Sequence, residues 1–175
     1  MNVQDLIVSS IRRAVVEVFA TMLAAEIRPE EVVVEPPSPE PNDGVVSFIG
    51  VAGNWTGTGS LTCSPALACR ICAQMLLTES QAVNEEVLDA VAELTNMIIG
   101  NVKSDLEEHL GSLGLSIPTV VFGRNFRTKT AGNAEWVVER FRWNGEDLLV
   151  KMYLKPDTKT SHTAAHSVLG CPVEI

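Results

Sequence analysis

The chain has 175 residues, of which 46% are hydrophobic but only 5% aromatic. This is enough for one domain with a core built mainly of aliphatic side chains. The formal net charge of −9 argues against binding to nucleic acid or to an anionic membrane surface, because both depend on basic side chains. We therefore expect a soluble acidic protein that binds another protein or a small molecule.

The N-terminal segment gives no sign of a secretory signal, because Asp5, Arg12 and Arg13 interrupt its apolar residues. No run approaches the ~20 apolar residues of a membrane span. A reducing cytoplasm is the default expectation. In that compartment we expect free thiols at the four cysteines, Cys63, Cys69, Cys72 and Cys171.

The first third of the chain contains one predicted helix and the first strands. Helical periodicity covers Asp5–Ala25, and the Arg28-Pro29 pair is expected to end this helix. The β-branched run in Glu31–Glu35 predicts a strand, and the proline-rich Pro36–Gly44 predicts a solvated loop. Val45–Val51 and Thr56–Thr62 then read as the two strands of a hairpin.

Two helices are predicted next. Ser64 and Pro65 provide the cap and first position of a helix that runs to about Leu77. Asn84 is the expected cap of a long helix that ends near Leu110-Gly111.

The last predicted elements are strands. Leu115–Phe122 is expected to form one strand around Pro118, at a sheet edge or a strand start. Glu135–Trp143 and Glu146–Leu154 predict a hairpin, because Asn144-Gly145 is the preferred two-residue turn.

This order of elements predicts an α+β fold, with helices packed on a mostly antiparallel sheet. One helix followed by strands occurs twice, over Asp5–Thr62 and over Glu85–Leu154, which suggests duplicated α-β-β-β halves. We expect residues 1–155 to form a single domain and residues 156–175 to form a flexible C-terminal tail.

The most informative feature lies inside the long predicted helix. Asp89, Glu93, Asn96, Gly100, Lys103 and Glu107 share one stripe of that helix. The opposite side is apolar, with Val87, Val91, Leu94, Ile98 and Val102. We expect the apolar side to pack on the core, so that Glu93 and Asn96 are held on an exposed, rigid surface.

This motif resembles the signature of the CheC/CheX/FliY chemotaxis phosphatases. The resemblance consists of Asp89-x-x-x-Glu93-x-x-Asn96 and a downstream Pro118-Thr-Val-Val segment. The strings Glu93-Leu-Thr-Asn96-Met-Ile-Ile-Gly100 and Pro118-Thr-Val-Val-x-Gly123 are most similar to CheX. The bare E-x-x-N pattern is weak, whereas the combination is fairly specific.

The resemblance implies hydrolysis of the aspartyl-phosphate on a CheY-type response regulator. Asn96 would orient the attacking water, and Glu93 would contact the active-site lysine of the receiver domain. Asp89, Gly100 and Lys103 would contribute to partner binding. The Mg²⁺ ion would arrive with the receiver, so no cofactor bound by this chain is expected.

The resemblance also implies one active site per chain and a homodimer formed through strand pairing. The first predicted helix offers Glu17-Val-Phe-Ala20, in which alanine stands where an asparagine would be needed. The sheet edge for a dimer could come from Trp136–Trp143 or from Val45–Val51. The main alternative function is a non-catalytic binding module or adaptor for a receiver domain or a flagellar-switch protein, since FliM-like relatives share the fold without the motif.

Each candidate residue also has a structural interpretation. Asn is a poor helix former in mid-helix, which favours function for Asn96 over a merely solvated position. Gly100 could allow another backbone to pack closely or could leave clearance for a partner. Lys103, considered with its neighbour Asn101, could simply pair with Glu107. The Cys69-x-x-Cys72 pair is more typical of small buried side chains than of a zinc or redox site.

Overall fold

The computed structural model describes residues 2–30, 42–129 and 134–158, and it has three helices and seven strands there. The helices are α1 (Val3–Met22), α2 (Pro65–Leu76) and α3 (Glu85–Leu110). The strands are β1 (Arg28–Pro29), β2 (Asn42–Gly53), β3 (Trp55–Cys63), β4 (Leu113–Leu115), β5 (Thr119–Phe126), β6 (Val137–Trp143) and β7 (Glu146–Pro156). No helix in these ranges is long and apolar enough to cross a membrane.

All the strand pairings are antiparallel, and they join the strands into one sheet. The order is β1-β6-β7-β3-β2, and both β4 and β5 pair with the outer side of β2. β3 and β7 therefore lie at the centre, β2 and β6 flank them, and β1 and β5 are outermost. Along the chain, α1 is followed by β1, β2 and β3, and α3 is followed by β4, β5, β6 and β7, so the predicted succession of a helix and strands occurs twice. β1 was not a predicted strand.

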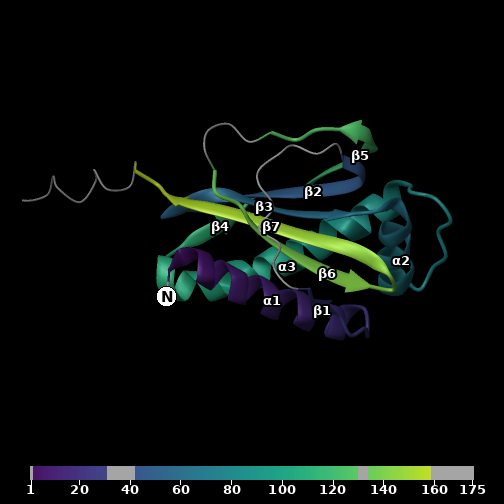
Figure 1. The fold of residues 1–175 in the computed structure, drawn as a ribbon, viewed down its shortest axis with the longest axis horizontal. Helices are drawn as coiled ribbons and strands as arrows, with labels where there is room; N and C mark the ends of the chain where they lie inside the picture. The colour runs from purple at the N-terminus through teal and green to yellow at the C-terminus, as the bar shows by residue number, and fades with distance from the viewer. Residues whose placement is uncertain (1, 31–41, 130–133, 159–175) are drawn as a thin grey trace, which may run out of the picture.

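α1 and α3 lie on the same face of the sheet (Figure 1). α1 contacts β6 and packs beside α3, which contacts β2 and β3. Ile99 of α3 sits directly on Gly59 of β3, where a Cβ atom would lie only 2.7 Å from the Ile99 side chain. The core lies between these helices and the sheet, and its buried side chains are mostly aliphatic.

Local sequence explains where the helices begin. Ser64 Oγ accepts a hydrogen bond from Leu67 N at 3.0 Å, and Asn84 Oδ1 accepts one from Val87 N at 3.0 Å. Both caps agree with the prediction, and they satisfy backbone donors that have no partner inside the helix. The Asn144-Gly145 turn has positive φ at both residues, as the predicted two-residue hairpin requires.

Two predicted boundaries are wrong. α1 ends at Met22 rather than near Ala25, because Leu23 takes the capping position and Ala24 adopts a positive φ of 46°. The segment predicted as one strand over Leu115–Phe122 is two strands, β4 and β5, separated around Pro118. β5 begins directly after Pro118 and lies at the sheet edge, as the proline predicted. Proline has no backbone N–H for a sheet ladder, which explains the interruption.

Val45–Val51 cannot be the predicted dimer edge, because β2 is paired on both sides. The predicted strand Glu31–Glu35 lies outside the described residues, as does Cys171. β7 continues to Pro156, one residue past the predicted end of the domain. The division into domain and tail remains a prediction.

Candidate functional site

The exposed side of α3 carries the predicted stripe. Asp89, Glu93 and Asn96 are all exposed. The five apolar residues of the opposite side are fully buried, which confirms the predicted orientation of the helix: Val87, Val91, Leu94, Ile98 and Val102. A carboxylate and a carboxamide are therefore held about one helical turn apart on an element fixed by the core.

Gly100 lies on the same stripe, one turn beyond Asn96. A Cβ atom built at Gly100 would meet nothing within 4 Å. Among the described residues, therefore, no other part of the chain packs closely against this glycine. The open space agrees with clearance for a partner molecule that approaches the helix backbone.

Lys103 and Glu107 continue the stripe towards the C-terminal end of α3. Lys103 Nζ lies 2.8 Å from Glu107 Oε2, so the predicted i,i+4 ion pair is present. Glu107 Oε1 also accepts a hydrogen bond from Leu113 N of β4 at 2.8 Å. Lys103 and the Leu113 N–H hold the pKa of the Glu107 carboxyl below its usual value.

The N-terminal half of the stripe is acidic. Glu85 and Glu86 occupy the first turn of α3, and Asp89 and Glu93 follow on the exposed side. These carboxylates create a negative field that would favour a partner surface rich in lysine. Across the residues that the structure describes, no group of three or more His, Cys, Asp or Glu side chains could hold a metal ion.

A segment of α1 repeats the pattern of α3 without the carboxamide. Ala14-Val-Val-Glu17-Val-Phe-Ala20 corresponds to Ala90-Val-Ala-Glu93-Leu-Thr-Asn96. Ala14, Val15 and Val18 are buried like Ala90, Val91 and Leu94, whereas Glu17 and Ala20 are exposed like Glu93 and Asn96. The two halves therefore present similar helix faces, but the pairing of Glu with Asn occurs on α3 and not at the matching positions of α1.

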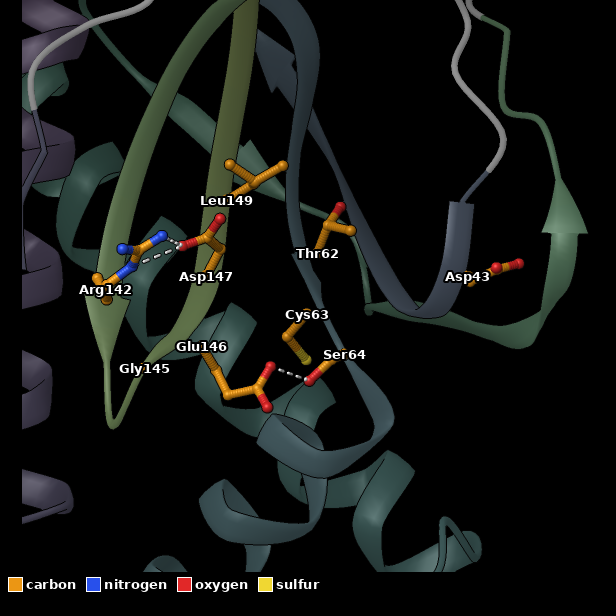
Figure 2. A pocket seen from close by; sticks show the side chains of 9 residues that line it. All are labelled: Asp43, Thr62, Cys63, Ser64, Arg142, Gly145, Glu146, Asp147 and Leu149. Carbon is orange, nitrogen blue, oxygen red and sulfur yellow. Dashed lines mark hydrogen bonds and ion pairs between the residues drawn. The ribbon is translucent and has the colours of Figure 1, made fainter.

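A cavity of about 300 Å³ lies away from this stripe, beside the turn between β6 and β7 (Figure 2). Polar side chains that line it form hydrogen bonds and ion pairs within the protein. Ser64 Oγ, which caps α2, donates to Glu146 Oε2 at 2.9 Å, and Arg142 contacts Asp147 Oδ1 at 3.0 Å. None of the predicted site residues lines this cavity.

The cysteines fit the predicted packing role. Cys63 and Cys72 are buried free thiols, and Cys69 is partly buried. Burial raises the pKa of the Cys63 thiol to about 12 and also raises the pKa of Cys72. Both shifts favour the unreactive protonated form.

One exposed apolar side chain on a strand that contacts α3 was not predicted. Phe122 of β5 is 48% exposed, although it belongs to a strand of the sheet. The only signal in the sequence was the Pro118-Thr-Val-Val segment that precedes it. That segment carries no indication of which strand positions are exposed.

Comparisons with known proteins agree with the fold and with the family that the sequence resembles. The family model "Chemotaxis phosphatase CheX" matches residues 45–142. The CheY-P phosphatase CheX of Thermotoga maritima is 33% identical over 90 residues, which are 50% of this chain and 57% of that protein. The chain therefore matches little more than half the length of this curated relative.

Solved structures extend the likeness to most of the chain. The chemotaxis protein CheX from Vibrio vulnificus has a TM-score of 0.74 and 25% identity, and the match covers 89% of this chain and all of the other. The CheX-CheY-BeF3-Mg²⁺ complex from Borrelia burgdorferi has a TM-score of 0.67 over 85% of this chain and 97% of that chain. At 20% identity, the second likeness shows the fold alone. The family model matches more than half of the 175 residues of this chain, so the chain belongs to the CheX family.

Proposed function

We propose that this protein hydrolyses the aspartyl-phosphate of a CheY-type response regulator. The observation that carries the proposal is the exposed pair of Glu93 and Asn96, fixed one turn apart on α3. The curated relative in Thermotoga maritima is named a CheY-P phosphatase, and the Borrelia burgdorferi neighbour was solved in complex with CheY. Both names agree with this substrate.

The proposed roles follow from the chemistry of the two side chains. The carboxamide of Asn96 can donate one hydrogen bond and accept another, so it can hold a water in line with the phosphorus without adding charge beside it. The carboxylate of Glu93 would bind the receiver lysine and fix the orientation of the two proteins.

The remaining groups of the site would come from the partner. Mg²⁺ would be held by the receiver, where it neutralises charge on the phosphoryl group. Asp89, Gly100 and Lys103 would lie at the margin of the contact. Because Lys103 is engaged by Glu107, its contribution would be to order that end of the stripe.

The experiment is a screen for loss of phosphate from phosphorylated receiver domains of the same genome. We expect the wild-type protein to accelerate decay of at least one receiver. Asn96→Ala should lower the rate constant at saturating protein on the order of 100-fold, because a misplaced water costs that much. Circular dichroism should show the same fold, since Asn96 is exposed.

A matched control is available on α1. Glu93→Gln should weaken the interaction with the receiver, whereas Glu17→Gln, at the corresponding exposed position of α1, should leave hydrolysis unchanged. If the wild-type protein accelerates decay of no receiver, the proposed activity is wrong. Binding without hydrolysis would instead favour a receiver adaptor, and Asn96→Ala with full activity would remove the role given to Asn96.

A further inference from the structure

β5 lies at the edge of the sheet and exposes apolar side chains. It pairs with β2 on one side, and no described strand pairs with its other side. Phe122 is 48% exposed and Val121 is 37% exposed. An aromatic side chain half in solvent at a sheet edge is a common feature of protein contact surfaces.

Phe122 lies on the side of the sheet that carries the helices. Its register partner is Val45 of β2, which is buried in the core beneath them. Residues directly opposite in an antiparallel pair share a face, so Phe122 points to the same side as Val45. The neighbouring Val121 pairs with Val46 and therefore points to the opposite face.

Phe122 is also level with the N-terminal half of α3. Ile99 packs on Gly59, which is the register partner of Ile49. The four residues from Ile49 back to Val45 span about 13 Å, which is the length of about nine helical residues. Because the C-terminal end of α3 leads into β4 at the Gly53 end of β2, this distance runs towards Ala90. Phe122 therefore lies towards the N-terminal end of α3.

The stripe on α3 is turned towards this edge of the sheet. Asn96, Gly100, Lys103 and Glu107 succeed one another at intervals of three or four residues, and Glu107 bonds to Leu113 of β4. β4 and β5 pair with the same side of β2, and α3 contacts both. The opposite flank of α3 faces α1, where Arg13 pairs with Asp105.

We propose that Phe122 is a second docking element for the receiver domain, lying beside the Glu93 and Asn96 stripe. The inference rests on the proposed function, because it takes the molecule that binds α3 as the occupant. Phe122 would pack against an apolar side chain in the loops around the phosphorylation site of the receiver. A phosphorylation site at the carboxyl ends of the strands of an α/β fold is surrounded by such loops. The contact would set affinity and the choice of receiver, whereas Asn96 would set the rate of the chemical step.

The test measures binding and hydrolysis separately. The binding probe is a receiver that the wild-type protein dephosphorylates, loaded with Mg²⁺ and beryllofluoride. Phe122→Ser should raise the Kd about tenfold, the loss typical of a central aromatic contact. The hydrolysis rate at saturating protein should change less than twofold. Asn96→Ala should give the converse result, with little change in Kd and a large loss of rate.

Two controls separate docking from general surface effects. Val121→Ser changes an apolar side chain of the same strand on the other face, and Leu77→Ser changes an 89% exposed leucine after α2. Neither should change the Kd more than twofold. If Val121→Ser weakens binding as much as Phe122→Ser, the helix side of β5 is not the docking surface and the inference is wrong.

A measurement on the wild-type protein removes any dependence on how the variants fold. Binding of the receiver should slow hydrogen exchange in a peptide that covers β5 as well as in one that covers α3. Protection of α3 alone would overturn the inference while leaving the proposed function intact. A change of oligomeric state in Phe122→Ser, seen by light scattering with an unchanged Kd, would assign Phe122 to contacts between copies of this chain instead. If no receiver binds the wild-type protein, it is the proposed function that fails.

Discussion

Two residues of α3, Gly100 and Asn96, disfavour the helix and lie on the surface that is proposed to bind the receiver. Gly100 disfavours the helix relative to alanine by about 1 kcal/mol, and none of the residues that the structure describes occupies the space beside it. Because no contact among the described residues requires glycine at this position, we infer that contact with a partner molecule does. Asn96 shows the same conflict, because asparagine is a poor helix former in mid-helix.

Gly100→Ala should therefore stabilise the protein while impairing its activity. We expect the free energy of unfolding in urea to rise by up to about 1 kcal/mol, because alanine restricts the unfolded chain and meets no clash. The same methyl group would block close approach of a receiver, so the Kd for the beryllofluoride-loaded receiver should rise severalfold. Equilibrium unfolding and isothermal titration calorimetry measure the two effects.

Ser9→Ala provides the control for this pair of measurements. Ser9 is an exposed residue of α1, so its replacement should change helix propensity without touching the α3 stripe. It should raise stability slightly and leave the Kd unchanged. If Gly100→Ala stabilises the protein and binds the receiver as well as wild type, the clearance role of Gly100 is refuted.

At the scale of the elements, an ion pair between Arg12 of α1 and Glu139 of β6 joins α1 to the sheet. This pair was not predicted from the sequence. Glu139 alternates with Val137 and Phe141 along β6, so it points to the helix side of the sheet, where it is 1% exposed. Its Oε2 atom accepts from Arg12 Nε at 2.7 Å, and its Oε1 atom has no hydrogen-bond partner among the described residues. Alternation predicts which side a residue faces but not that a carboxylate would be tolerated there.

Removing the partner of this buried carboxylate should be costly. We expect Arg12→Met to lower the free energy of unfolding by about 2 kcal/mol, since an uncompensated charge would remain in the core. The double variant Arg12→Met with Glu139→Leu should return to within about 1 kcal/mol of wild type, because an apolar pair removes the unpaired charge. Urea unfolding of the four proteins in the cycle measures the coupling.

Arg13→Met is the matched control for Arg12→Met. Arg13 also bridges α1 to another element, through Asp105 of α3, but its side chain is 64% exposed. Exposed ion pairs contribute little to stability, so this variant should remain close to wild type. Equal losses for Arg12→Met and Arg13→Met would contradict the distinct role given to the buried pair.

At the scale of the whole molecule, strong local patterns predicted most of the fold. The caps Ser64 and Asn84, the long amphipathic helix and the Asn144-Gly145 hairpin all lie where local chemistry places them. The succession of a helix and strands that occurs twice along the chain was also predicted. The separate strand β4 before Pro118 and the early end of α1 were missed, because strand partners and helix ends depend on tertiary contacts.

The site was predicted only in part, for a similar physical reason. Asp89, Glu93 and Asn96 belong to one helix, so periodicity alone predicted that they share an exposed face. Phe122 comes from a different element, and its position beside α3 depends on the register of β5 with β2. No local sequence pattern predicts the register of β5 with β2.

Because the Cys63 thiol is buried, we expect the free energy of unfolding of the protein to depend on pH in the alkaline range. The pKa of Cys63 is raised by burial from an ordinary value of 9.0 to about 12. Between these values the unfolded chain loses the thiol proton while the folded chain retains it. The unfolded state then binds fewer protons, so the free energy of unfolding must fall as pH rises above 9. This contribution to stability is complete below pH 9 and declines steadily towards pH 12.

The comparison of wild type with Cys63→Ala isolates this effect, because all other titrating groups are common to both proteins. Between pH 8 and pH 10, wild type should lose about 1.4 kcal/mol more of its free energy of unfolding than the variant. Urea unfolding at each pH measures the difference, and the variant can start from a lower stability without affecting the slope. Parallel pH curves for the two proteins would show that the Cys63 thiol is not protected by burial. If the slopes differ as expected, thiol-reactive reagents should modify Cys63 only at the rate at which the core opens.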